Sequence, residues 1–81
     1  MQEEFHMYSK LGCSHCKSLK QVFTLKNIPF KEYRYPEHFK DKFFKDLFGK
    51  DATFPQVVHN GIKIGGASDT IKYMKENNII S

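Results

Sequence analysis

The chain has 81 residues, which is enough for one small domain with one hydrophobic core. Hydrophobic residues make up 40% of it and charged residues 27%, which is typical of a soluble globular protein. The net charge is +4, but twelve of the thirteen basic residues are lysines mixed with acidic residues. We therefore expect a solvated, lysine-rich surface and no nucleic-acid partner.

The amino-terminal residues, MQEEFHMYSK, lack a basic segment followed by an apolar one, so no secretory signal is predicted. No apolar run approaches the roughly 18 residues that suggest a membrane span. We therefore expect a cytoplasmic protein without a membrane partner. In that compartment structural disulfides are rare, and cysteine pairs are usually catalytic or bind metal.

The first half of the chain predicts a strand, a helix and a second strand. Apolar and polar residues alternate from Glu3 to Ser9, as in a strand, and Gly12 then breaks the pattern. Helical spacing of apolar residues follows from Ser14 to Lys26, and Pro29 lies just beyond its end. Aromatic residues alternate with charged ones from Phe30 to Tyr35. This order predicts parallel strands joined by a right-handed crossover.

Phenylalanines dominate the next segment, EHFKDKFFKDLFG, at helical spacing, and Gly49 closes it. A stripe of this kind is most simply part of the core. Two short strands then follow, Val57 to His59 and Ile62 to Ile64. They flank Asn60-Gly61, the residue pair most typical of a two-residue hairpin turn.

After Gly65-Gly66, Ser68 is expected to cap the amino end of a last helix from Asp69 to Asn77. The element order is therefore β-α-β-α-β-β-α. We expect an α/β fold with a four-stranded mixed sheet and helices on both faces. Residues 1–81 form a single domain in this interpretation.

Both cysteines lie in the stretch LGCSHCKSLK, two residues apart. Cys13 falls at the start of the first helix, where free backbone N–H groups and the helix dipole stabilise a thiolate. A thiolate is the nucleophile of disulfide exchange. Cys16, one turn further, is spaced to attack a mixed disulfide on Cys13 and release the bound partner. The pair is therefore expected to be catalytic.

Charges near the motif favour the same chemistry. Lys10 and Lys17 add positive potential, while the nearest acidic residues in the sequence, Glu4 and Glu32, lie some way off. Nothing local in the sequence opposes a thiolate. His15, between the cysteines, is expected to be partly exposed and to tune the site, since its charge can change near neutral pH.

Two other interpretations of the cysteines fit the sequence less well. Plain core cysteines would not need this spacing. A structural zinc site needs four ligands, and the chain has no second Cys-x-x-Cys and no paired histidine spacing. We therefore expect no metal and no resident cofactor.

Three stretches together resemble the glutaredoxin family of the thioredoxin superfamily. YSKLGCSHC is similar to the family's lysine followed by Cys-x-x-Cys, and ATFPQVV to its Thr-Val-Pro segment, in which the proline is cis. IGGASDT is similar to its Gly-Gly turn before the last helix. The resemblance covers nearly the whole chain and implies the thioredoxin-like fold. The short length of the chain resembles that of the small glutaredoxins of bacteria and phages.

The resemblance also implies a groove for glutathione as co-substrate. The backbone of Phe54 would pair with the tripeptide as one antiparallel rung. Ser68 and Asp69 would hold its γ-glutamyl end, and Lys10 its glycyl carboxylate. The complete set of expected glutathione contacts is Lys10, His15, Phe54, Pro55, Gln56, Gly66, Ser68 and Asp69.

Two departures from the family pattern stand out. Cys-Ser-His-Cys replaces the common Cys-Pro-Tyr-Cys, which alters the surface beside the cysteines. Ala52 stands where many members carry a basic residue, which removes one contact to a carboxylate, and Gln56 is expected to compensate in part.

The leading functional prediction is a monomeric, glutathione-dependent thiol–disulfide oxidoreductase that acts on protein disulfides and glutathione mixed disulfides. Ribonucleotide reductase is a protein substrate that the resemblance implies. One alternative is a thioredoxin-like redoxin reduced by a flavoprotein reductase. Another is an iron–sulfur cluster carrier, although carriers in the family usually have a single cysteine in the motif.

Overall fold

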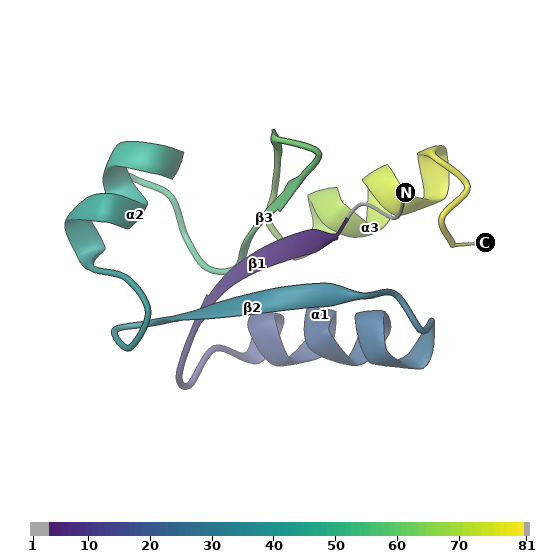
Figure 1. Cartoon of the computed structure of the whole chain (residues 1–81), viewed down its shortest axis with the longest axis horizontal. Helices are drawn as coiled ribbons and strands as arrows, with labels where there is room; N and C mark the ends of the chain where they lie inside the picture. The colour runs from purple at the N-terminus through teal and green to yellow at the C-terminus, as the bar shows by residue number, and fades with distance from the viewer. Residues whose placement is uncertain (1–3, 81) are drawn as a thin grey trace.

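The computed structural model describes residues 4–80 and confirms the element order expected from the sequence (Figure 1). The expected strand start at Glu3 lies outside the described residues. The elements are β1 (Phe5–Lys10), α1 (Ser14–Leu25), β2 (Phe30–Tyr35), α2 (Asp41–Phe48), β3 (Gln56–His59), β4 (Ile62–Gly65) and α3 (Ala67–Glu76).

The four strands form one mixed sheet in the order β2-β1-β3-β4. β1 runs parallel to β2, with Phe5 opposite Phe30, and antiparallel to β3, with Tyr8 opposite Gln56. β3 and β4 form the expected hairpin around Asn60-Gly61, and both turn residues have positive φ. β1 therefore lies inside the sheet, and its carboxyl end leads directly into the cysteine motif.

Helices α1 and α3 pack on one face of this sheet. The alternation of β1 points Phe5 and Met7 toward them, and both side chains are buried. Burying such apolar side chains is the main source of stability in a domain of this size. The buried cluster on this face consists of Phe5, Met7, Leu19, Phe23, Val57 and Met74.

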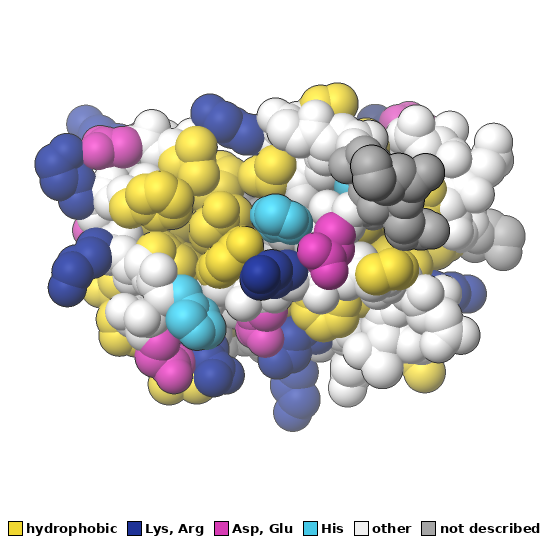
Figure 2. Space-filling model, in the orientation of Figure 1, with side chains coloured by type: hydrophobic (Ala, Val, Ile, Leu, Met, Phe, Trp, Pro, Cys, Tyr) yellow, Lys and Arg dark blue, Asp and Glu magenta, His cyan; other side chains and the backbone are white. Residues whose placement is uncertain are grey.

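Helix α2 packs on the opposite face through aromatic contacts. The Tyr8 ring, which points away from Met7, lies 5.4 Å from the Phe39 ring and 5.1 Å from the Phe48 ring. Phe44 stacks on Phe54 with centroids 4.1 Å apart. Hydrophobic side chains gather over α2, whereas Lys and Arg are spread across the visible face (Figure 2). The expected helices on both faces are thus confirmed, and α2 supports the segment that precedes Pro55.

Two details of the sequence prediction need correction. Phe43, one of the phenylalanines expected in the core, is 47% exposed, because it lies about 100° around the helix from its neighbour Phe44, which is the one buried against the sheet. Helix α3 begins at Ala67, and its N-cap is Gly66 instead of Ser68. Thr70 closes the first turn by donating from both N and Oγ1 to the Gly66 carbonyl. Ser68 therefore lies inside the helix and is exposed.

Candidate active site around the two cysteines

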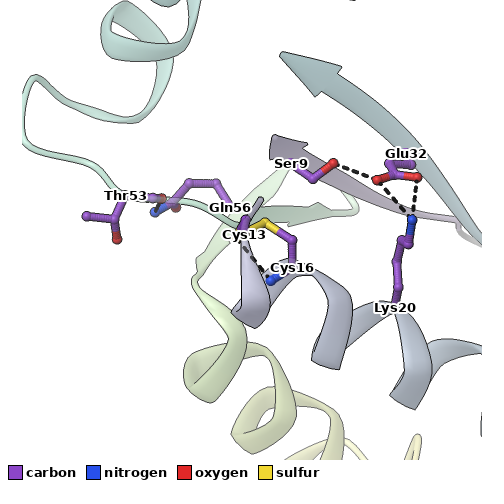
Figure 3. The surroundings of a disulfide bond; sticks show 7 residues. All are labelled: Ser9, Cys13, Cys16, Lys20, Glu32, Thr53 and Gln56. Carbon is purple, nitrogen blue, oxygen red and sulfur yellow. Dashed lines mark hydrogen bonds and ion pairs between the residues drawn. A yellow bond between two sulfur atoms is a disulfide. The ribbon is translucent and has the colours of Figure 1, made fainter. Parts of the chain in front are cut away.

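Cys13 and Cys16 form a disulfide at the amino end of α1 (Figure 3). Their Cα atoms are 5.3 Å apart. Cys13 is the N-cap of the helix, and its Sγ accepts a hydrogen bond of 3.1 Å from the Cys16 backbone N. Cys13 is half-buried, but Cys16 is only 4% exposed. A partner arriving from solvent therefore reaches the Cys13 sulfur first.

The local sequence explains this placement. β1 ends at Lys10, and a two-residue turn brings Cys13 to the helix start, where its carbonyl accepts from the Lys17 N–H at 3.2 Å. The first turn of α1, which the structure describes in full, contains no Asp or Glu. The positive end of the helix dipole is therefore not offset by an acidic side chain of its own first turn.

One side of the disulfide, which we call the β3–α3 flank, carries Lys10, Phe54, Pro55, Gly66 and Asp69. The Lys10 Nζ lies 5.4 Å from the centroid of the Phe54 ring. The Phe54–Pro55 peptide is cis, as the resemblance implied, and Pro55 is buried. Because β3 begins only at Gln56, Phe54 lies outside the strand and beside the Lys10 side chain.

The Gly65-Gly66 turn completes the same flank. A Cβ on Gly66 would lie 3.6 Å from the Pro55 carbonyl oxygen, so the turn runs directly beside the proline. Gly65 has a φ of +124°, and a Cβ there would meet the Asp69 Oδ2 at 2.5 Å. The turn thus needs glycine at position 65 both for its backbone and for the adjacent carboxylate.

The remaining predicted contacts are less closely grouped. The Gln56 Nε2 donates to the Thr53 carbonyl at 2.9 Å, so this side chain braces the loop before Pro55 (Figure 3). His15 and Ser68 are both exposed. In the structure, Lys10 therefore lies near Phe54, Pro55 lies beside Gly66, and the Asp69 carboxylate lies beside Gly65. The glutathione-binding role of the whole set stays a prediction.

The other side of the disulfide opens into a groove of about 980 Å³ between α1 and β2, which we call the α1–β2 groove. Its lining includes Cys13 and the charged side chains of Lys17, Lys20, Glu32 and Arg34. Glu32, one of the two acidic residues nearest to the motif in the sequence, lines this groove together with Cys13, because the crossover between the parallel strands returns the chain beside α1.

Glu32 is held by two neighbours (Figure 3). The buried Ser9 Oγ donates to its Oε2 at 2.6 Å, and the Lys20 Nζ lies 3.3 Å from its Oε1. Burial raises the pKa of Glu32, but the bonds from Ser9 and Lys20 and the nearby charge of Arg34 outweigh it, so the pKa lies below its usual value. Glu32 is therefore a paired carboxylate at neutral pH.

Sequence reasoning missed Ser9, Lys20 and Glu32 as neighbours of the motif. A signal was available, because Lys20 follows Cys16 by four residues and so lies one turn further along the same helix face. The register of β2 against β1, which pairs Glu32 with Met7, was needed to place the carboxylate.

Within residues 4–80, no group of three or more His, Cys, Asp or Glu side chains is arranged to hold a metal ion. Over the same residues, every helix is too short or too polar to cross a membrane.

Comparison with solved structures shows the same fold. Glutaredoxin 1 from Francisella tularensis, solved as a complex with cacodylate, superposes with a TM-score of 0.76 at 24% identity, covering 95% of this chain and 96% of that one. A buckwheat glutaredoxin–glutathione complex superposes with a TM-score of 0.75 at 17% identity, covering 95% of this chain and 73% of the other. The thioredoxin-like glutaredoxin fold is confirmed.

Comparison of sequences identifies the family. Residues 6–64 match the family model described as glutaredoxin. The mitochondrial glutaredoxin-2 of Pongo abelii is 33% identical over 79 residues, which cover 91% of this chain and 48% of the relative. The chain thus spans about half the length of that relative. With its Cys13–Cys16 pair at Cys-x-x-Cys spacing, the chain belongs to the glutaredoxin family, as a dithiol member.

Proposed function

We propose that the chain is a glutathione-dependent thiol–disulfide oxidoreductase that reduces protein disulfides and glutathione mixed disulfides. The observation that carries this proposal is the disulfide at the start of α1, with Cys13 accessible and Cys16 buried behind it. An exchange enzyme needs one sulfur that meets substrates and a second that acts only within the protein.

In the reduced enzyme, the Cys13 thiolate attacks one sulfur of a protein disulfide, breaking that bond and forming a mixed disulfide. The other substrate sulfur leaves as a thiolate and takes a proton from solvent. The Cys16 thiolate then attacks the Cys13 sulfur, which releases the second substrate thiol and forms the Cys13–Cys16 disulfide. The Cys16 N–H that bonds to the Cys13 Sγ in the oxidised form is placed to stabilise the attacking thiolate.

Glutathione completes the cycle. Two molecules of it reduce the Cys13–Cys16 disulfide and leave as oxidised glutathione. We place the tripeptide on the β3–α3 flank, where Phe54 lies outside the strand ladder and the glycine turn lets a ligand approach the backbone closely. The structural likeness to the buckwheat glutaredoxin, whose structure is a glutathione complex, supports glutathione as the ligand.

The glutathione contacts on this flank are weak individually. Lys10 and Asp69 are exposed, so each charge contact contributes about 0.2–1 kcal/mol. Weak, shared binding suits a co-substrate that must leave after each turnover. A cytoplasmic location, a monomeric state and ribonucleotide reductase as a substrate belong to the same proposal.

Turnover of a glutathionylated peptide by the reduced protein with glutathione, glutathione reductase and NADPH tests the proposal. We expect turnover by the chain and none by Cys13→Ser. Absence of turnover, together with rapid reduction of the oxidised chain by thioredoxin reductase, would instead favour a thioredoxin-like redoxin. A visible absorbance band after anaerobic purification would favour an iron–sulfur carrier.

A further inference from the structure

We propose that the α1–β2 groove docks an acidic, extended segment of the protein substrate next to the substrate's reacting cysteine. The inference rests on the proposed exchange function and adds the chemistry of the protein partner. It concerns the side of the disulfide opposite to the β3–α3 flank, where glutathione is proposed to bind.

The groove begins at the reacting sulfur. It is lined by Cys13 and Cys16 at one end and by Thr24 and Leu25 at the other, so it follows the whole length of α1. The twelve residues of α1 span about 18 Å. An extended segment needs about five residues to cover that length. A substrate cysteine held at Cys13 would therefore bring its neighbouring residues over the groove.

The charges of the groove favour an acidic segment. Three cationic side chains, Lys17, Lys20 and Arg34, line it apart from Lys10, which the groove shares with the β3–α3 flank. Glu32 is the one carboxylate among the lining residues, and Lys20 and Ser9 already satisfy it. Lys17 is exposed and has no ion-pair partner within residues 4–80. Arg34 pairs through Nε with Glu37, which is not among the lining residues. The remaining positive charge is best matched by Asp or Glu on the partner.

Apolar side chains mark both ends of the groove. Leu11, beside the disulfide, is 69% exposed, and Leu25, at the far end, is 79% exposed. A segment that lies along the groove would cover both side chains and remove their apolar surface from water. We therefore expect an apolar residue of the segment to contact Leu25.

Capture of peptides tests this inference without glutathione. The reduced Cys16→Ser variant is mixed with one of three peptides of equal length, each with one cysteine joined to 2-thiopyridine by a disulfide. The three peptides differ only in the residues on both sides of that cysteine, which are Asp in the first peptide, Asn in the second and Lys in the third. Attack of the Cys13 thiolate on the peptide sulfur joins the peptide to the protein and releases pyridine-2-thione, whose absorbance gives the rate.

We expect the Asp peptide to react roughly tenfold faster than the Lys peptide at low salt, with the ratio falling as salt is added. Adding Lys17→Gln and Arg34→Gln should lower the ratio of Asp to Asn rates by about threefold, since each exposed charge contributes little. Lys63→Gln, on the far edge strand β4, is the matched control and should leave the ratio unchanged. Because each ratio compares two peptides on the same variant, a general change in the reactivity of Cys13 affects both rates equally and leaves the ratio unchanged.

Equal rates for the three peptides, or the same ratio in the groove variant and the Lys63→Gln control, would overturn the inference. A second measurement locates the peptide. An Asp peptide with serine in place of cysteine should shift the amide NMR signals of Thr24 and Leu25, and shifts confined to Phe54 and Gly66 would also overturn it.

Failure of the docking inference is distinguishable from failure of the proposed function. Glutathione turnover by the unmodified chain does not involve the charged peptides, and peptide capture does not involve glutathione. Turnover without charge preference removes only the docking inference. Charge preference without turnover removes only glutathione dependence.

Discussion

The two sides of the Cys13–Cys16 disulfide differ in what they offer a partner. On the β3–α3 flank the backbone has unusual geometry, with a cis proline at position 55 and a glycine turn at 65 and 66. On the α1–β2 side the backbone is an ordinary helix and an ordinary strand, and charged side chains carry the chemistry. One side is suited to backbone recognition of a tripeptide and the other to charge recognition of a longer chain.

If the proposed function and the docking inference both hold, this difference would let a single reactive sulfur serve two classes of partner. Recognition through free backbone groups and a tight turn selects one small ligand by its shape. Recognition through exposed lysines tolerates many sequences, provided that their charge is complementary. Substitutions confined to one side should therefore affect one class of partner and spare the other, whereas loss of the shared sulfur should remove both activities.

Replacement of the shared sulfur should have the largest effect. Cys13→Ser is expected to reduce both glutathione turnover and protein disulfide reduction to background, because both partners react at this atom. Parallel assays with a glutathionylated peptide and with a disulfide-bonded protein measure it. Ser18→Ala, on the exposed part of the same helix, is the matched control. Residual activity toward either class would mean that Cys16 attacks substrates directly.

Replacement of the buried sulfur should separate the two activities. Cys16→Ser is expected to abolish protein disulfide reduction, because the mixed disulfide on Cys13 can no longer be resolved from within the protein. Turnover of glutathione mixed disulfides should continue, since that route needs only one thiol of the enzyme. The same two assays measure both rates, and equal losses in both would contradict this division of labour.

A change on the β3–α3 flank should affect glutathione alone. Asp69→Asn keeps the shape of the side chain but removes the charge expected to pair with the ammonium of glutathione. We expect KM for the glutathionylated peptide to rise by about two- to fivefold, as for a single exposed charge contact. Asp51→Asn, on an exposed loop, is the matched control. If Asp69→Asn also slowed the capture of the Asp peptide by about two- to fivefold, the two sides of the disulfide would not act separately.

A change in the α1–β2 groove should lower stability at neutral pH and have little effect in acid. Because the pKa of Glu32 is lowered in the folded state, its stabilising contribution is complete above its ordinary value of 4.5 and is lost as the pH falls through the lower value. Glu32→Gln should therefore cost about 1 kcal/mol at pH 7 and progressively less below pH 4.5. Urea unfolding at several pH values measures it, and a cost that does not depend on pH would contradict the pairing.

The contrast between the sides also explains which features could be predicted from the sequence. Cys13, Pro55 and the glycine turn are recognisable because few residue types can occupy such positions. The strands and helices followed from periodicity, and most of their bounds differ from prediction by one or two residues. The start of α3 was misplaced because Ser68 is a frequent N-cap, whereas here the carbonyl of Gly66 meets Thr70.

The α1–β2 groove could not be predicted in the same way. Lysine and glutamate are common on any surface, so the four-residue spacing of Lys20 from Cys16 did not single it out, and Glu32 has no distinctive sequence context. Their pairing depends on which face of β2 turns toward α1 and on the register of β2 against β1. These are tertiary features, so the groove became recognisable only when the fold was known.

Titration of the oxidised, isotope-labelled protein with S-methylglutathione, which has no free thiol and so cannot reduce the disulfide, followed by amide NMR, tests the separation of the two sides most directly. We expect the shifts to concentrate at Lys10, Phe54, Gly66, Ser68 and Asp69, with the amides of Lys20, Thr24 and Leu25 unmoved. Shifts concentrated along Lys20 to Leu25 instead would place glutathione in the α1–β2 groove and contradict the proposed arrangement.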